Sequence, residues 1–241
     1  MNFEQFLAPA DAARVRHAVE KFARCGLRSF ALTGGLALEA QMTGLGRGPR
    51  IRSLNDVDIV VESFASLPAA LAETFLVRHI HPQAPEGKIL VQFVDPHECL
   101  RIDVFRACGA TMERSHPLSF GSTVIKVVSL EDLAARAGRL LMDIEQCATV
   151  ARKNAEDFKS LLEFIHLERV EVAWQDHRRA TDPLSFKDSS TGLLQLIQLH
   201  GNLLVDFPYS RDVDAICPRC REVEPFRLAS PRMIMSILGY C

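Results

Sequence analysis

Three aspartates interrupt apolar segments of the chain, where a carboxylate needs a partner. Asp56 and Asp58 open the segment DVDIVVE, and Asp103 lies inside RIDVF. Side chains alternate between the two faces of a strand, so Asp56 and Asp58 are expected to point the same way. Like charges so close together are unfavourable unless a cation neutralises them, which a divalent ion can do. A polar strand end in solvent would also explain Asp56 and Asp58, and a salt bridge to a neighbouring arginine would explain Asp103.

A pair of glycines precedes these aspartates. The apolar run 30–32 predicts a short buried strand, Thr33-Gly34-Gly35 interrupts it, and a helix is expected to open at 36–42. Such a turn exposes backbone N–H groups at the positive end of a helix dipole, and glycine has no Cβ to hold a ligand away. The turn therefore has the outline of a phosphate site, although the same pattern is often only a tight turn.

One arrangement explains the glycines and the aspartates together. Carboxylates from adjacent strands can hold two Mg²⁺ ions over a nucleotide whose phosphates lie on the glycine turn, as in two-metal phosphoryl transfer. We therefore expect Asp56, Asp58 and Asp103 to be the catalytic metal ligands. Arg52 follows the glycine-rich loop and would either steer the triphosphate or belong to an ordinary solvated loop.

These motifs resemble the DNA polymerase β-like nucleotidyltransferase superfamily, whose signature is a glycine-rich turn, a spaced Asp-x-Asp and a third carboxylate. Within it, FALTGGLALEA and RSLNDVDIVVE are similar to the bacterial AbiEii-type branch. Two later segments, SLEDLAARAGRLL and ARKNAEDFKSLL, resemble helices of that branch, so the likeness covers roughly 30–165. The nucleotide-binding residues implied are Thr33, Gly34, Gly35, Arg52, Lys153 and Asp157.

The resemblance implies Mg²⁺-dependent transfer of a nucleoside monophosphate from an NTP to an acceptor hydroxyl. It also implies a toxin–antitoxin or phage-defence role, with RNA as a candidate acceptor and an antitoxin protein as a candidate partner. The alternative is a catalytically inactive binding or scaffold module. It is favoured by Gly35, where many members have serine, and by Arg136 or Arg139, where relatives have lysine; Asn154 also replaces an aspartate of the helical motif.

The order of elements predicts an α+β fold, with a small mixed β-sheet core and a helical C-terminal region. We expect strands at 30–32, 56–62, 77–81, 89–94, 100–105 and 124–128. We expect helices at 9–25, 36–42, 68–75, from 129 onward, at 151–166 and at 193–204. The domains would be a catalytic core, 1–128, a helical region packing on it, 129–175, and a C-terminal helix with a cysteine-containing tail, 191–241. A polar linker would span 176–190.

The bulk composition excludes several classes of protein. A formal net charge of -2 argues against a surface that is wholly a nucleic-acid footprint. No apolar stretch approaches the ~20 residues of a membrane span, and the first residues lack a secretion signal, so we expect a cytoplasmic protein with no membrane partner. The seven cysteines are then expected to be reduced. Cys217 and Cys220 resemble one knuckle of a zinc ribbon, but such a site needs four ligands and we do not favour it.

Overall fold

The computed structural model describes residues 1–48, 50–54, 56–83 and 87–206, apart from the side chains of 78–89. Its described residues form two compact units. The sheet unit comprises Met1–Ala107 and Pro117–Val127, and the helical unit comprises Cys108–His116 and the described chain from Val128 onward. Each unit has a core of its own.

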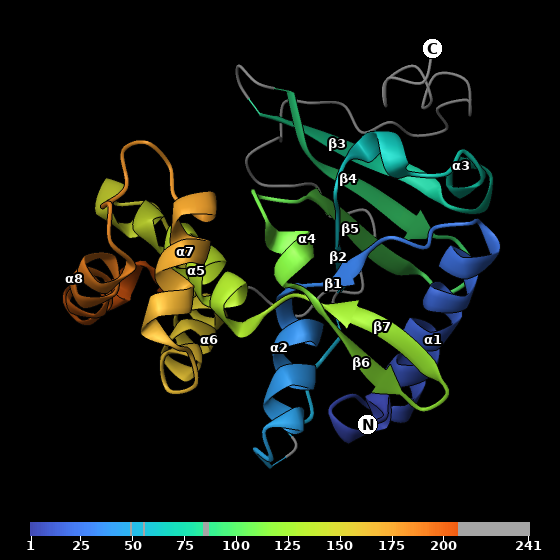
Figure 1. Cartoon of the computed structure of the whole chain (residues 1–241), viewed down its shortest axis with the longest axis horizontal. Coiled ribbons are helices and arrows are strands. Elements are labelled where there is room, and N and C mark those ends of the chain that lie inside the picture. Colours follow the sequence, from blue (N-terminus) through green and yellow to red (C-terminus); the bar gives the residue numbers. More distant parts are fainter. Residues whose placement is uncertain (49, 55, 84–86, 207–241) are drawn as a thin grey trace. The chain divides into compact units, whose positions relative to one another are not determined.

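The sheet unit is built on a seven-stranded sheet of order β3-β4-β5-β2-β1-β7-β6 (Figure 1). Its strands are β1 (Ala31–Leu32), β2 (Asp56–Val61), β3 (Leu76–Gln83), β4 (Gly87–Asp95), β5 (Leu100–Arg106), β6 (His116–Phe120) and β7 (Thr123–Val127). Its helices are η1 (Phe3–Gln5), α1 (Pro9–Arg24), α2 (Gly34–Gly44), η2 (Phe64–Ser66) and α3 (Ala70–Thr74).

Strand directions in this sheet are mixed. The central strand β2 pairs in parallel with β5 and antiparallel with β1, and β1 pairs in parallel with β7. Strands β3, β4 and β5 form an antiparallel series. The connection between β4 and β5 is the expected turn: the Asp95 carboxylate accepts the backbone N–H groups of His97 and Glu98 at 3.0 and 3.2 Å. The predicted α+β fold with a mixed sheet is confirmed.

The core of the sheet unit is lined by aromatic rings and by one apolar face of α1. The apolar residues that α1 buries follow the i, i+3, i+4 spacing of one helix face: Ala12, Val15, Ala18, Val19 and Phe22. The ring of Phe22 lies 5.7 Å from that of Phe75, which lies 6.2 Å from that of Phe93. Helix α2 packs against β2, and this contact holds the start of α2 beside the first residues of the strand.

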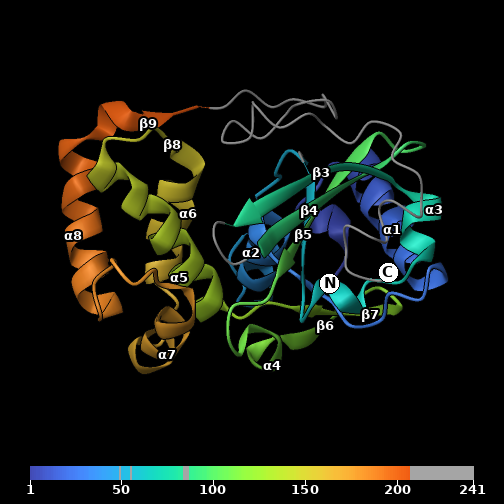
Figure 2. The same ribbon diagram turned by 90° about the horizontal axis from the view of Figure 1, so that it is seen from above.

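In the helical unit, α5 packs against α6, α7 and α8, and Figure 1 shows them as one bundle. The helices are α4 (Thr111–Arg114), α5 (Leu130–Leu141), η3 (Met142–Gln146), α6 (Arg152–Leu162), α7 (Leu167–His177), α8 (Phe186–Leu199) and η4 (Gly201–Leu203). Two short strands, β8 (Val150–Ala151) and β9 (Leu204–Val205), pair in parallel, and Figure 2 shows them side by side. Ser129 caps α5 as expected, its hydroxyl accepting the Asp132 N–H at 3.1 Å.

The core of the helical unit forms around a glycine of α5. Trp174 and Phe186 make an edge-to-face contact at 5.8 Å, and Phe158 lies 6.1 Å from Phe186. A Cβ at Gly138 would lie only 3.3 Å from the Phe158 ring, so the absent side chain lets these rings approach α5. The expected apolar stripe of α6 is therefore buried through Phe158 and Leu161.

Several expected boundaries differ from the structure, among them the helix expected at 36–42, which is Gly34–Gly44, and the helix expected at 151–166, which ends at Leu162. The segment 176–190 contains the end of α7 and the start of α8, because the Ser185 hydroxyl caps a helix from Phe186 by accepting the Asp188 N–H at 3.2 Å. The helix expected at 193–204 consequently begins earlier and ends at Leu199. The helix expected at 68–75 is only Ala70–Thr74. The separability of the expected domains stays a prediction, and Cys217 and Cys220 lie outside the described residues.

None of the described helices combines the length and the apolar character that crossing a bilayer requires.

Candidate active site

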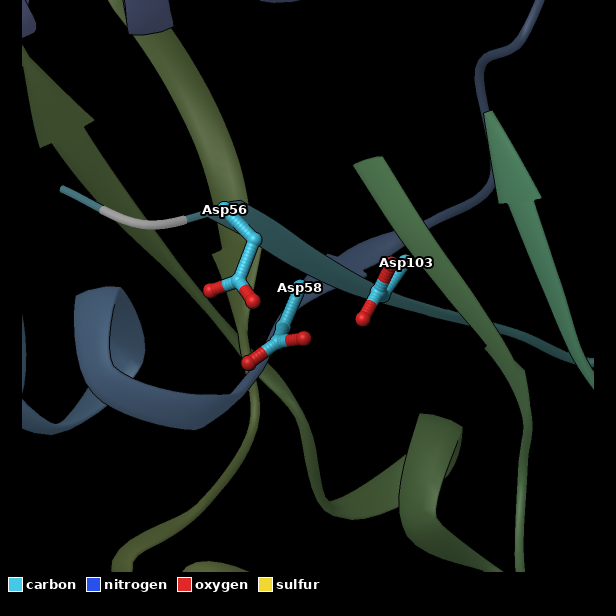
Figure 3. A group of neighbouring side chains, drawn as sticks. All are labelled: Asp56, Asp58 and Asp103. Atoms are coloured by element: carbon cyan, nitrogen blue, oxygen red, sulfur yellow. The ribbon is translucent and has the colours of Figure 1, made fainter. Parts of the chain in front are cut away.

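The three aspartates of the sequence analysis converge on one face of the sheet. Strands β2 and β5 run in parallel, with Asp58 directly opposite Asp103. Asp56 lies two residues before Asp58 on the same strand, and so on the same face. Figure 3 shows the three carboxylates projecting to the same side, and one oxygen from each lies within 4.8 Å of the others. The expected convergence of these side chains is confirmed.

Arg101 joins this carboxylate group from β5. It lies opposite Asp56 and forms an ion pair with it, and its Nε lies 3.4 Å from Asp103 Oδ1. Burial lowers the pKa of Arg101, but the charges of Asp56, Asp103 and Asp58 outweigh burial and raise this pKa above its ordinary value. The salt bridge weighed as an alternative for Asp103 therefore exists, and it is part of the same cluster.

Gln92 holds the third carboxylate from the other side. It lies on β4 directly opposite Asp103, and its Nε2 donates to Asp103 Oδ1 at 2.9 Å. Gln92 is only 4% exposed, and its Oε1 is buried without a hydrogen-bond partner among the described residues. A buried amide left half satisfied costs free energy. Gln92 therefore orients Asp103, and the buried Oε1 costs the fold some stability.

The glycine turn lies directly against Asp58. Thr33 is buried and its N–H donates to the Asp58 carbonyl at 2.9 Å, which links the turn to β2. Gly34 begins α2 with a φ of +61°, a conformation that glycine adopts without strain. A Cβ at Gly34 would lie 1.9 Å from Asp58 Oδ2. Only glycine allows the N-terminus of α2 to approach this carboxylate so closely.

The second glycine lies against Arg52. A Cβ at Gly35 would lie 2.7 Å from the Arg52 Nε, so the guanidinium covers the backbone there. Arg52 Nη1 also donates to Glu39 Oε1 at 3.3 Å, and Glu39 is a buried residue of α2. The arginine is therefore fixed beside the first turn of α2, rather than extended into solvent as a loop residue would be.

The remaining expected site residues belong to the helical unit. Lys153 and Asp157 are on α6 of the helical unit, where Lys153 is exposed and Asp157 half-buried. The sheet unit thus brings together seven of the expected residues with one another: Thr33, Gly34, Gly35, Arg52, Asp56, Asp58 and Asp103. A place for Lys153 and Asp157 at the nucleotide stays a prediction.

Sequence reasoning missed two polar partners of this site, Gln92 and Glu39. The salt bridge from a neighbouring arginine to Asp103 was expected as an alternative, and Arg101 forms it because it lies two residues before Asp103 and shares its face in the strand. Gln92 could have been found from the Asp95 turn, which sets the register of β4 and β5. Glu39 carries no signal in the sequence, because it occupies a helix position that reads as an ordinary solvated one.

The donor set fits a hard divalent cation. Each of the three aspartates offers a carboxylate oxygen, and carboxylate oxygen is the ligand that Mg²⁺ prefers in proteins. Asp103 is buried, whereas Asp56 and Asp58 are half-buried, so the group opens to solvent on the side of β2. A cation and its water ligands can therefore reach the cluster.

Comparisons with known proteins give only weak likenesses. No family model and no curated protein matches the chain. The solved structure of ANT(2")-Ia in complex with adenylyl-2"-tobramycin is similar over 66% of this chain and 94% of its own, at 15% identity and a TM-score of 0.46. Lincomycin-bound LnuA, a lincosamide antibiotic adenylyltransferase, is similar over 64% and 97%, at 11% identity and a TM-score of 0.41.

A third similar structure is an antigenic nucleotidyltransferase-like protein from Paracoccidioides brasiliensis. It covers 79% of this chain and 89% of its own, at 15% identity and a TM-score of 0.39. At these values, the chemistry of the present chain has to be derived from its own residues.

Proposed function

We propose that this chain is a metal-dependent nucleotidyltransferase, which moves a nucleoside monophosphate from an NTP to an acceptor hydroxyl. One observation carries the proposal: three carboxylates from two parallel strands converge beside a glycine turn that opens a helix. The carboxylates suit Mg²⁺ and the N-terminus of α2 suits phosphate, so the two halves of a metal–triphosphate complex have adjacent sites.

Each residue of the site then has a role. Asp56, Asp58 and Asp103 would hold the metal ion, which would supply neutralisation of phosphate charge and activation of the acceptor hydroxyl. Gly34 and Gly35 present backbone N–H groups to the triphosphate.

One cationic side chain of the site would stabilise the leaving group. The acceptor oxygen attacks the α-phosphorus, the bond to the bridging oxygen breaks and pyrophosphate leaves. Arg52, fixed beside Gly35, balances the charge that develops on pyrophosphate. Asp103 is the residue that takes up the proton of the acceptor hydroxyl, and Lys153 and Asp157 are proposed to add nucleotide contacts.

Calorimetric titration with each NTP and Mg²⁺ tests binding, and release of pyrophosphate tests turnover. We expect Asp58→Asn to lower the rate about 1,000-fold, which corresponds to roughly 4 kcal/mol of barrier. Glu62→Gln is the matched control, since it removes one exposed carboxylate just beyond the other end of β2 and should leave both readouts unchanged.

The outcomes separate the candidate functions. NTP binding that depends on Asp58 but gives no pyrophosphate with any acceptor would identify the alternative, an inactive binding or scaffold module. If Asp58→Asn and Glu62→Gln both bind NTP and Mg²⁺ as the natural chain does, the carboxylate group is not the site and the proposal is wrong.

The acceptor and the biological role are a finer proposal. The likeness of the Gly34–Gly35 and Asp56–Asp58 motifs to the AbiEii-type branch supports RNA as acceptor and a toxin–antitoxin or phage-defence role with an antitoxin partner. Labelled NTPs offered with total RNA, protein and an aminoglycoside would identify the acceptor. Label in RNA supports this proposal, and label only in protein or the aminoglycoside contradicts it.

A further inference from the structure

Arg101 is a positive charge inside the group of carboxylates that is proposed to hold a metal ion. It lies two residues before Asp103 on β5 and directly opposite Asp56 on β2. Its guanidinium forms an ion pair with Asp56, and its Nε lies 3.4 Å from Asp103 Oδ1. One side chain of β5 therefore contacts two of the three carboxylates, and the roles proposed for the site leave it unused.

The contact of Arg101 with Asp103 is an ion pair without a hydrogen bond from Nε. Gln92 Nε2 donates to the same oxygen, Asp103 Oδ1, at 2.9 Å. Arg101 Nε is buried and has no hydrogen-bond partner among the described residues, which costs free energy. In the helical unit, by contrast, Arg114 donates to both oxygens of Asp132. The geometry of Arg101 therefore suits neutralisation of charge better than a structural network of hydrogen bonds.

The guanidinium of Arg101 is accessible from the face on which the carboxylates gather. Its side chain is 23% exposed, compared with 20% for Asp56 and 11% for Asp103. Residues 101 and 103 share one face of β5, and the carboxylates project to that side (Figure 3). A ligand that approaches the carboxylates therefore also meets the positive charge.

This charge acts in opposite directions on two ligands of the site. A bare divalent cation is attracted by the carboxylates and repelled by Arg101. The complex of a divalent cation with a triphosphate has a net negative charge, so Arg101 attracts it and offsets repulsion from the carboxylates. Neither effect requires direct contact with the guanidinium.

We propose that Arg101 is a specificity-determining residue, which biases the site against a bare divalent cation and toward the metal–triphosphate complex. The inference rests on the proposed function, because the metal and the triphosphate are those of that site. Specificity is a difference between two affinities, and the charge of Arg101 changes the two in opposite directions. Arg101 thus lowers the occupation of the carboxylates by metal when no nucleotide is present.

The test compares two probes on the full chain at pH 7. These are Mn²⁺ alone, measured by electron paramagnetic resonance, and the Mn²⁺ complex of inorganic tripolyphosphate, measured by calorimetry. We expect Arg101→Met to bind Mn²⁺ about tenfold more tightly than the natural chain and the complex about tenfold more weakly. A merely structural role of Arg101 would weaken both. An unchanged affinity for Mn²⁺, or changes in the same direction for the two probes, would overturn the inference.

Further variants separate the charge of Arg101 from its shape. Arg101→Lys keeps the charge, so both affinities should stay within about twofold of the natural values. A rise in Mn²⁺ affinity equal to that of Arg101→Met would contradict the inference. If Arg101→Met fails to fold, Arg101→Gln, which keeps a donor near the carboxylates, serves with the same expectations.

Arg106→Met is the matched control for the loss of one positive charge. Arg106 is exposed at the end of β5 and, by strand alternation, lies on the opposite face from Arg101. Both affinities should be unchanged in this variant. A shift as large as that of Arg101→Met would assign the effect to net charge and contradict a specific role of Arg101.

Asp58→Asn distinguishes failure of this inference from failure of the proposed function. Mn²⁺ binding that Asp58→Asn abolishes but Arg101→Met leaves unchanged overturns only the role of Arg101. If neither the natural chain nor Arg101→Met binds Mn²⁺, or if Asp58→Asn binds it as the natural chain does, the proposed function and this inference are both wrong.

Discussion

Aspartates occupy two contrasting environments in this protein. In the helical unit, one carboxylate, Asp132, receives hydrogen bonds from arginine, serine and threonine side chains and from a histidine. In the sheet unit, Asp56, Asp58 and Asp103 crowd together, and Arg101 forms ion pairs with Asp56 and Asp103. The two sites differ in the number of donors for each carboxylate. Asp132 has four partner side chains and shares Arg114 with Asp176, whereas Asp56 and Asp103 share Arg101 in a group of three carboxylates.

The difference separates a structural carboxylate from a binding one. A single buried charge surrounded by donors holds segments together, and Asp132 joins α4, α5 and α7 in this way. Three carboxylates at one point repel one another, and a fold keeps such repulsion where a ligand relieves it. Substitution should therefore have opposite effects on stability at the two sites.

The largest expected effect is at Asp132. Asp132→Asn removes the charge that pairs with Arg114 and His177, so we expect the free energy of unfolding to fall by about 3–5 kcal/mol. Denaturant titration of the full chain measures it. A variant as stable as the natural chain would contradict the conclusion that Asp132 is a structural carboxylate.

The same carboxylate makes the free energy of unfolding depend on pH in the acid range. Its pKa is depressed in the fold, so its contribution to stability is complete above the unfolded carboxyl value of about 3.9 and declines as the pH falls below that. The difference in unfolding free energy between the natural chain and Asp132→Asn should therefore shrink below about pH 4. A difference that is constant from pH 7 to pH 3 would assign the effect to packing.

The two glycines offer the next test. Gly34→Ala combines a positive φ with a Cβ placed against Asp58 Oδ2, and we expect a loss of about 2 kcal/mol in stability together with loss of Mg²⁺-dependent NTP binding. Gly35→Ala meets only the movable end of Arg52, so it should weaken NTP binding with little change in stability. Equal losses of stability in the two variants would contradict this distinction.

Gln92, which donates a hydrogen bond to Asp103, offers a test that separates orientation of the carboxylate from stability of the fold. Gln92→Leu removes the hydrogen bond that Gln92 donates to Asp103 but also removes the buried unsatisfied Oε1, so stability should change little. Loss of an orienting partner should reduce Mg²⁺ affinity about 10- to 100-fold. Gln92→Glu is the paired variant, since it adds negative charge at the same position. Unchanged Mg²⁺ affinity in Gln92→Leu would show that the amide only fills space.

The smallest expected effect has the opposite sign. Without metal, Asp58→Asn relieves repulsion from Asp56 and Asp103, so the free energy of unfolding should rise by about 0.5–1 kcal/mol. Added Mg²⁺ should stabilise the natural chain and not the variant. A variant less stable than the natural chain in the absence of metal would place Asp58 among the structural carboxylates.

Local patterns predicted much of this site. Strand alternation places Asp56 and Asp58 on one face, and the same rule reaches Arg101 from Asp103. The contact of His177 with Asp132 could not be predicted in that way. The two residues are 45 positions apart, on helices whose packing no short motif specifies.

Helix α7 shows a different limit. Val170, Ala173, Trp174 and His177 recur at helical spacing and are buried, but no helix was expected between 166 and 176, and the polar residues from 176 onward with Pro183 favoured a linker. The Trp174 indole N–H donates to the Pro183 carbonyl at 2.8 Å, and tertiary contacts thereby order a segment whose composition is that of a loop. Composition alone could not show this.

The parallel pairing of β2 with β5 also makes the site a reporter of folding. Asp56 and Arg101 are 45 residues apart, and the segment between them must be ordered before the strands can meet. A slip of one residue would turn Asp103 to the opposite face. Such distant pairing forms slowly. The time at which cation binding recovers during refolding therefore reports when β2 and β5 pair in the correct register. Chains whose strands pair in a wrong register would regain the helical circular-dichroism signal but would not bind the metal.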